Sequence, residues 1–203
     1  MQKIIGIFIM VFVIGIYVIS MKGRTQNDKS TAQKETITSV DGYKNITQIE
    51  EKIDTAYPEK PAEVIALHNE LMKIFYGQIP TGETLEDYAR TIRKLYSAQL
   101  QNLNSIETQV RDLETEKAYI ESINITLVVN QIKEIYISKS EEIGEETAEV
   151  NVMHTTNQGT LYRTYFLINE EGLWKINSWE NKEAVNTSST ATTSSEEETK
   201  LEE

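Results

Sequence analysis

The sequence has no cysteine among its 203 residues. Disulfide bonds, thiol catalysis and cysteine-ligated metal sites are therefore excluded. Histidine is almost as scarce, with only His68 and His154. Neither has a second metal-binding side chain three or four positions further on, so the spacing typical of a zinc site is missing. We expect a protein without a metal ion or cofactor.

Positively charged residues are also fewer than negatively charged ones. Twenty Lys and Arg residues stand against 32 Asp and Glu, which gives a net charge of −12, and no cationic cluster is visible. Phosphate recognition needs a cationic surface, so nucleic acid is not an expected partner. The same charge argues against adhesion of the domain to an anionic lipid surface.

Long apolar runs are absent except for Ile4 to Met21, which carries no charge. As a helix this run spans roughly 27 Å, close to the roughly 30 Å of a bilayer core. We predict a transmembrane anchor in residues 1–22. A cleaved signal peptide is the alternative, because Val18 and Ser20 suit processing, but the run is longer than the usual signal core.

The flanking charges bear on orientation. More Lys and Arg follow the run than precede it, which by the positive-inside rule alone favours a cytoplasmic domain. However, a run with only three residues ahead of it resembles an export signal, and an acidic domain would translocate despite a few nearby charges. We therefore predict a single-pass protein of the cell membrane with an extracytoplasmic domain.

Two segments have too few apolar residues to form a core. Residues 23–44 are polar and are predicted to be a flexible linker. Residues 184–203 are rich in Ser and Thr and then in Glu, which predicts a disordered acidic tail. A single folded domain is thus expected over residues 45–183.

The first part of that domain has helical spacing. Apolar stripes predict helices over 45–56, from Pro61 to just before Gly77, from Leu85 to Leu103 after a Thr84–Asp87 cap, and from Ile106 to Ile120. We expect the stripes to cover a sheet.

Beyond residue 123 the period changes to two. Ala148, Val150 and Val152 alternate with polar residues, which is typical of a half-buried strand. Strands are predicted over 125–138, 145–155, 161–168 and 173–179, with a bulge near Asn130–Gln131. The predicted fold class is α+β, with helices packed on a curved four-stranded antiparallel sheet.

The order of these elements and the ending Gly172-Leu173-Trp174-Lys175-Ile176 resemble the nuclear-transport-factor-two-like superfamily, over about Thr55 to Lys182. This resemblance implies a cone-shaped sheet that wraps helices and leaves an open mouth. The apolar run together with Tyr57–Val64 and His68–Met72 is similar to uncharacterised single-pass proteins of Gram-positive anaerobes. The superfamily includes enzymes and bare scaffolds, so the fold does not give the function.

An enzyme of this superfamily would resemble ketosteroid isomerase, with an acid or base on the strands and a Tyr donor beside it. The predicted strands contain no Asp, and away from the strand ends their carboxylates are only Glu134 and Glu149. We therefore predict no enzymatic activity. His68 is interpreted as a partly buried helix residue, and His154 as forming a structural hydrogen bond to a neighbouring turn.

Aromatic residues are the remaining candidates for a site. They could line the mouth of a cone and bind a small apolar or sugar-like ligand, although packing in the core is the favoured interpretation. The candidate pocket-lining residues are Tyr96, Tyr119, Tyr165, Phe166, Trp174 and Trp179.

We expect a non-catalytic, membrane-anchored scaffold or protein-interaction domain displayed outside the cytoplasmic membrane. Its partner would be another envelope protein or a second copy of the chain. A module that binds a small ligand in the cone cavity is the alternative, and an enzyme of unknown reaction is a third hypothesis.

Overall fold

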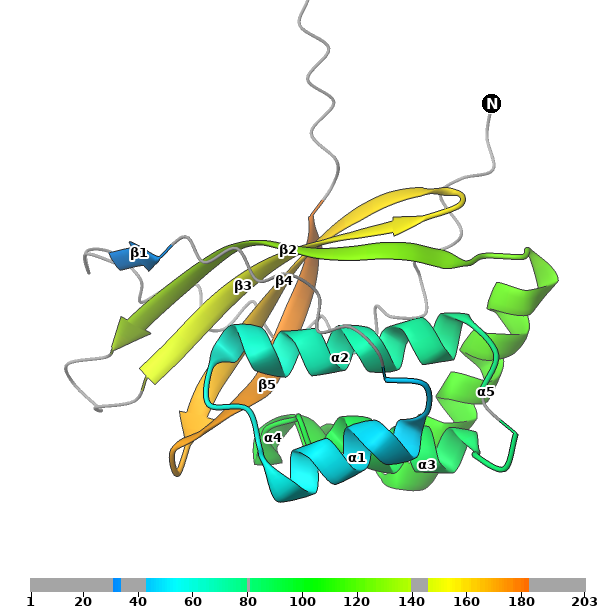
Figure 1. The fold of residues 1–203 in the computed structure, drawn as a ribbon, viewed down its shortest axis with the longest axis horizontal. Helices are drawn as coiled ribbons and strands as arrows, with labels where there is room; N and C mark the ends of the chain where they lie inside the picture. The colour runs from blue at the N-terminus through cyan, green and yellow to red at the C-terminus, as the bar shows by residue number, and fades with distance from the viewer. Residues whose placement is uncertain (1–30, 34–42, 80, 140–145, 183–203) are drawn as a thin grey trace, which may run out of the picture.

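The computed structural model describes residues 31–33, 43–79, 81–139 and 146–182. Figure 1 shows an α+β fold in which helices lie against one face of a curled antiparallel sheet. The predicted α+β class, with helices packed on a curved antiparallel sheet, is thereby confirmed. The predicted anchor in residues 1–22 and the predicted tail in residues 184–203 lie outside the described residues.

The helices begin where local capping predicts. Asn45 accepts a hydrogen bond from the Gln48 amide at the start of α1, Pro61 opens α2, and Thr84 and Asp87 form a reciprocal capping box before α3. Each cap satisfies amide groups that have no partner within the helix. The helices are α1 (Ile46–Thr55), α2 (Pro61–Tyr76), α3 (Leu85–Arg93), α4 (Ala98–Leu103) and α5 (Ile106–Ser122).

The helix predicted from Leu85 to Leu103 is in fact two helices. Between α3 and α4 the chain pairs with a strand, because Ile176 N donates to Leu95 O at 2.8 Å and Ser97 N donates to Ile176 O at 2.9 Å. Backbone groups used in this way are not available for a continuous helix. Ser97 then caps α4 by accepting from the Leu100 amide.

The sheet has five strands in the order β1-β2-β3-β4-β5, all antiparallel. The prediction of four strands was wrong by one: the short β1 pairs with β2 and lies within the predicted linker. The strands are β1 (Thr31–Gln33), β2 (Leu127–Lys139), β3 (Glu146–Thr156), β4 (Gly159–Glu170) and β5 (Leu173–Lys182). Strand β3 begins one residue later and ends one residue later than predicted, whereas β4 and β5 extend beyond the predicted bounds and add Glu170 and Glu180.

The long strand β2 is irregular at two places. Its register with β3 shifts between Leu127 and Val129 and again between Ile132 and Glu134. These shifts flank the predicted bulge position at Asn130–Gln131 without coinciding with it. Extra residues of this kind bend a strand and increase its twist.

The turn between β4 and β5 is tight. Both Glu171 and Gly172 have positive φ angles, 54° and 86°, as a two-residue type I′ hairpin requires. This turn places Trp174 on the inner, concave face of the sheet, where it is 6% exposed.

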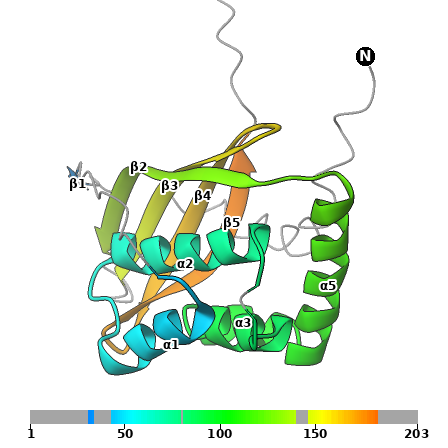
Figure 2. The ribbon, with the colours of Figure 1, turned by 45° about the vertical axis from the view of Figure 1, so that its right-hand side comes forward.

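Helix α2 lies across the concave face and packs against β2, β3 and β5, as Figure 2 shows from a second direction. Helix α1 packs on α2 and α3, and α5 packs on α3 and α2. The expectation that every stripe covers the sheet was wrong for α5, in which only Ile120 is buried. No helix among the described residues is long and apolar enough to cross a bilayer.

Candidate functional site

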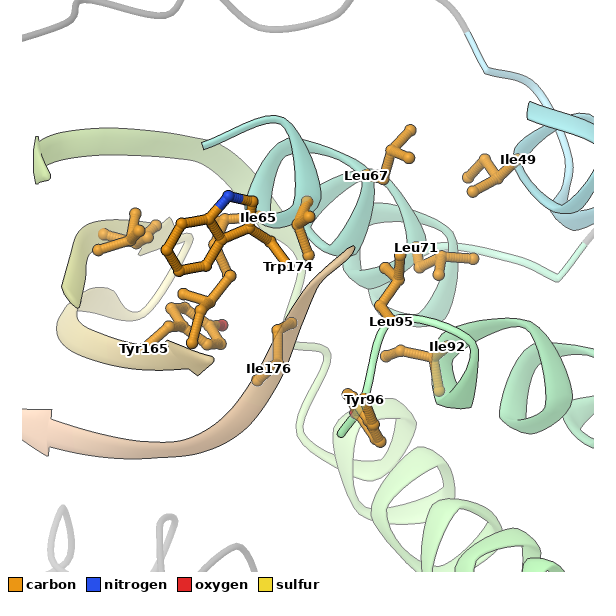
Figure 3. Close-up of a cluster of buried hydrophobic side chains, with 14 of the residues drawn as sticks. Ile49, Ile65, Leu67, Leu71, Ile92, Leu95, Tyr96, Tyr165, Trp174 and Ile176 are labelled. Carbon is orange, nitrogen blue, oxygen red and sulfur yellow. The ribbon is translucent and has the colours of Figure 1, made fainter. Parts of the chain in front are cut away.

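Tyr165 is the centre of a polar cluster inside the fold. It lies on β4 with no exposed surface, and Figure 3 shows it among aliphatic side chains of the core. The ring of His68, from α2, meets it edge-on with 5.1 Å between ring centroids, and the ring of His154, from β3, is 6.1 Å away. The fold thus brings both histidines of the chain to one tyrosine.

Hydrogen bonds fix the tautomer of His154. Its Nδ1 lies 2.6 Å from Asn130 Oδ1, which only accepts, so Nδ1 carries the proton. Its Nε2 is then free to accept from the Tyr165 hydroxyl at 3.3 Å. Asn130 Nδ2 donates in turn to Asn69 O at 3.1 Å. The partner of His154 is therefore a neighbouring strand, and the prediction of a bond to a turn was wrong.

His68 is 4% exposed, more deeply buried than predicted. Among the described residues its Nδ1 has no hydrogen-bond partner and is closed off from solvent. Burial, followed by the charge of Arg163, lowers the pKa of His68 to about 3, and the same causes lower the pKa of His154 to about 3. Both imidazoles are neutral at neutral pH.

Arg163 is the charged member of the cluster. It is 8% exposed and lies two residues before Tyr165 on the same face of β4, with Cζ 5.8 Å from the Tyr165 ring centroid. Its Nε donates to Asn181 Oδ1 at 2.9 Å, and its Nη1 donates to the Tyr165 hydroxyl at a long 3.4 Å. Among the described residues no carboxylate lies within ion-pair distance of the guanidinium.

The carboxylate that faces Arg163 comes from α5. Glu116 is half-buried; burial raises its pKa, and the charge of Arg163 opposes that rise. By contrast, Glu134 and Glu149, two strand carboxylates expected from the sequence, are exposed. Glu134 accepts from the Tyr136 hydroxyl at 3.0 Å, away from the histidines.

Three of the six predicted aromatic residues come together. Trp179 lies with its ring centroid 6.0 Å from that of Tyr96 and 6.4 Å from that of Tyr165. The remaining three do not join that group of rings. Trp174 is buried, and its carbonyl accepts from the Tyr57 hydroxyl at 2.8 Å. Phe166 is half-buried on the opposite face of β4 from Tyr165, and Tyr119 is 38% exposed.

Sequence reasoning missed Arg163 and Glu116. Every second position of β4 is occupied by Arg163, Tyr165 and Leu167 in turn. Alternate residues of a strand share one face, so this spacing alone indicated that Arg163 faces inward. Glu116 precedes the buried Ile120 by one helical turn, so it shares the inner side of α5. No group of His, Asp and Glu among the described residues is arranged to hold a metal ion.

A second site is an open groove of about 730 Å³ on the helical side of the molecule. It is lined by Glu50, Ile53, Asp54, Tyr57, Arg90, Arg93, Lys94, Gln101, Ile106, Leu173 and Lys175. Four of these side chains are cationic and two are acidic. The groove is thus a locally positive surface on a protein whose net charge is −12.

Internal contacts hold the walls of this groove in place. Lys94 Nζ lies 2.7 Å from Asp54 and 2.8 Å from Glu50, which ties α3 to α1. Lys175 Nζ donates to Lys94 O at 2.6 Å and lies 4.1 Å from the centroid of the Tyr57 ring. Arg93 ties α3 to the C-terminal end of α4 by donating to the carbonyl oxygens of Gln101 and Asn104.

Residues 1–179 match the family described as a domain of unknown function (DUF6715), and the chain belongs to that family. No curated protein matches the sequence. The class defined by the fold is an α+β domain with helices on the concave face of a curled sheet.

Proposed function

We propose that the chain is a non-catalytic protein-interaction domain and that the groove between α1, α3, α4 and β5 binds an acidic segment of a partner protein. The observation that carries this proposal is the groove itself: an open hollow with twice as many cationic as acidic side chains on an otherwise acidic molecule. Complementary charge of this kind steers association and selects the partner.

The packing of the interior supports a non-catalytic role. Tyr165, Val150 and Ile176 have no exposed surface, so side chains fill this part of the concave face. The two histidines are held neutral, far from the range in which a general base is effective near pH 7. In the part of the chain that the structure describes, no strand carboxylate forms a hydrogen bond with them to complete an acid–base pair.

The groove also has features of a prepared binding surface. Its cations are held by hydrogen bonds and ion pairs before any partner arrives, which lowers the entropy lost on binding. Leu173, which lines the groove, is a large apolar side chain with 41% of its surface exposed. An apolar contact inside a polar rim is the usual centre of a protein interface.

The setting of this domain is part of the proposal. The apolar run Ile4 to Met21 supports anchoring to the cell membrane. An acidic domain would translocate despite a few nearby charges, which supports an extracytoplasmic position. The curled sheet closed by Trp174-Lys175-Ile176 supports a relationship to the nuclear-transport-factor-two-like superfamily. The partner would then be an envelope protein with an acidic segment.

The test is site-specific photocrosslinking in intact cells, with the probe placed at Leu173. The control carries the probe at Val128, which is 61% exposed on β2. We expect one discrete crosslinked product from position 173 only, and we expect the crosslink to map to an acidic stretch of another protein. A probe placed in that acidic stretch should give the same crosslinked pair. A product made only of two copies of this chain, or equal products from both positions, would contradict the proposal.

Charge-reversal variants provide a second test of the proposed groove. Arg90 lines the groove with its side chain 59% exposed, so Arg90→Glu should weaken crosslinking without affecting folding. Lys133→Glu, an exposed change on β2 away from the groove, should leave crosslinking unchanged. Protease digestion of intact cells then tests on which side of the membrane the domain lies.

A further inference from the structure

Arg163 is a buried cation without a carboxylate partner among the described residues. Removing a charged group from water is costly unless an opposite charge or a full set of hydrogen bonds compensates. Within the described ranges, only Asn181 and Tyr165 accept from its guanidinium, and the second of these bonds is long. The guanidinium is thus only partly satisfied.

One edge of the guanidinium is unused. Nη2 makes no hydrogen bond within the part of the chain that is described, and it is not among the atoms that are both unpartnered and fully enclosed. It therefore faces space that solvent can reach. Together Nη1 and Nη2 form the fork that matches the two oxygens of a carboxylate.

The residues around the fork form a two-by-two patch on the concave face. Arg163 on β4 is paired with Asn181 on β5, and Tyr165 is paired with Trp179. The Trp179 ring is half-buried, so it presents an apolar surface next to the cation. A cation beside an aromatic surface suits a ligand with a carboxylate at one end and an apolar body at the other.

The other charged and titratable groups near Arg163 limit the charge of such a ligand. Glu116 of α5 and Tyr76 of α2 face it, along with His68 and His154. Glu116 is the carboxylic acid among these groups, and its ionised form repels an incoming anion. A singly charged ligand is therefore favoured over a doubly charged phosphate.

We propose that Arg163 forms, with Asn181 and Trp179, a binding site for a small organic monocarboxylate. This site goes beyond the interaction role of the groove, with which it shares no lining residue. The carboxylate takes the place of the missing counter-ion at Nη1 and Nη2, and its apolar body lies against Trp179.

The test uses the full chain and follows the two tryptophan indole N–H signals by NMR. Trp174 is buried with its backbone held by Tyr57 and serves as the internal reference. Benzoate should shift the Trp179 signal in a saturable way, while benzamide, which has the same shape without the charge, should bind at least about tenfold more weakly. Inorganic phosphate should bind more weakly than benzoate.

Two variants locate the effect. Arg163→Lys keeps the charge but loses the fork, and we expect benzoate affinity to fall roughly 10- to 100-fold. The matched control Arg90→Lys, at an exposed arginine of the groove, should not change it. Glu116→Gln removes the repelling carboxylate, so it should tighten benzoate binding several-fold and flatten the dependence of binding on pH.

Several outcomes would overturn the site. These are no saturable shift of Trp179, equal binding of benzamide and benzoate, equal binding by the Arg163→Lys variant, and tighter binding of phosphate than of benzoate. If the Arg163→Lys variant does not fold, two measurements still test the site. Equal binding of benzamide and benzoate to the parent chain would contradict the proposal, and so would unchanged or weaker binding of benzoate to the Glu116→Gln variant.

Discussion

The concave face around Tyr165 and the groove around Lys94 both gather polar side chains, but burial gives these groups different energetic roles. Around Tyr165 the groups are buried, the two histidines are neutral and Arg163 is the cationic group. In the groove Lys94 is 32% exposed and forms ion pairs with half-exposed and exposed carboxylates. We infer that the interior determines stability and that the groove is available for recognition.

The physical reason is the cost of removing polar groups from water. A buried polar group that loses its partner keeps the full desolvation penalty, whereas an exposed group recovers hydrogen bonds with solvent. Substitutions inside should therefore lower stability strongly, and substitutions in the groove should change it little. Each of the following experiments tests one side of that contrast.

The largest expected effect is at Trp174. Trp174→Ala should lower the free energy of unfolding by roughly 3–5 kcal/mol, because it removes a large side chain from the core. Leu173→Ala is the control: the neighbouring residue is 41% exposed, so its replacement should change stability by no more than about 0.5 kcal/mol. Denaturant titration measures both. A nearly unchanged melting temperature for Trp174→Ala would place Trp174 at the surface or in a pocket.

Acid should act on the interior through both histidines. Their folded-state pKa values are about 3, below the usual 6.5, because burial and then Arg163 disfavour the imidazolium. The unfolded chain therefore binds protons that the folded chain does not, so stability is complete above about pH 6.5 and falls as the pH drops toward 3. At about pH 5 each histidine should cost about 2 kcal/mol.

Stability measured between about pH 7.5 and pH 5 tests this prediction. His68→Leu removes one titrating group, so it should remove about half of the loss. The window ends at pH 5 because below that value the carboxylates, Glu116 among them, begin to contribute. A flat profile in the parent chain would mean that the imidazoles are solvated.

These contrasts also show which parts of the fold could be predicted. Helix starts depend on neighbours three residues away, as at Asn45 and Thr84, so the sequence indicates them directly. The break between α3 and α4 depends on Ile176, some 80 residues further along the chain, and no local pattern reveals it. Strand β1 is missed for the same reason, since Thr31 pairs with Ile137 and the segment is polar.

The candidate site follows the same division. Alternation along β4 places Arg163 and Tyr165 on one face, and alternation along β3 places His154 with Val150 and Val152. His68 and Glu116 come from helices, however, and which sheet residues they meet depends on how α2 and α5 pack. The periodicity of a sequence indicates which face of a helix or strand is buried. It does not indicate which residues of other elements pack against that face.

A smaller effect inside the cluster is expected from Tyr165→Phe. The change keeps the ring but removes the hydroxyl that donates to His154 Nε2 and accepts from Arg163. Both partners stay buried, so the free energy of unfolding should fall by about 1–3 kcal/mol. Tyr162→Phe, three residues earlier on the same strand and 40% exposed, is the matched control and should be neutral. Equal effects of the two changes would mean that the hydroxyl of Tyr165 is not held by this network.

The smallest effect is expected in the groove. Lys94→Met removes both ion pairs but keeps the aliphatic stem, and the pairs are partly exposed, so the free energy of unfolding should fall by no more than about 1 kcal/mol. The difference should shrink further at high salt, because screening weakens exposed pairs more than buried ones. Chemical denaturation with urea, which is uncharged, at low and high salt measures this. A loss as large as that of Trp174→Ala, unaffected by salt, would show that Lys94 is a structural residue and that the groove is part of the core.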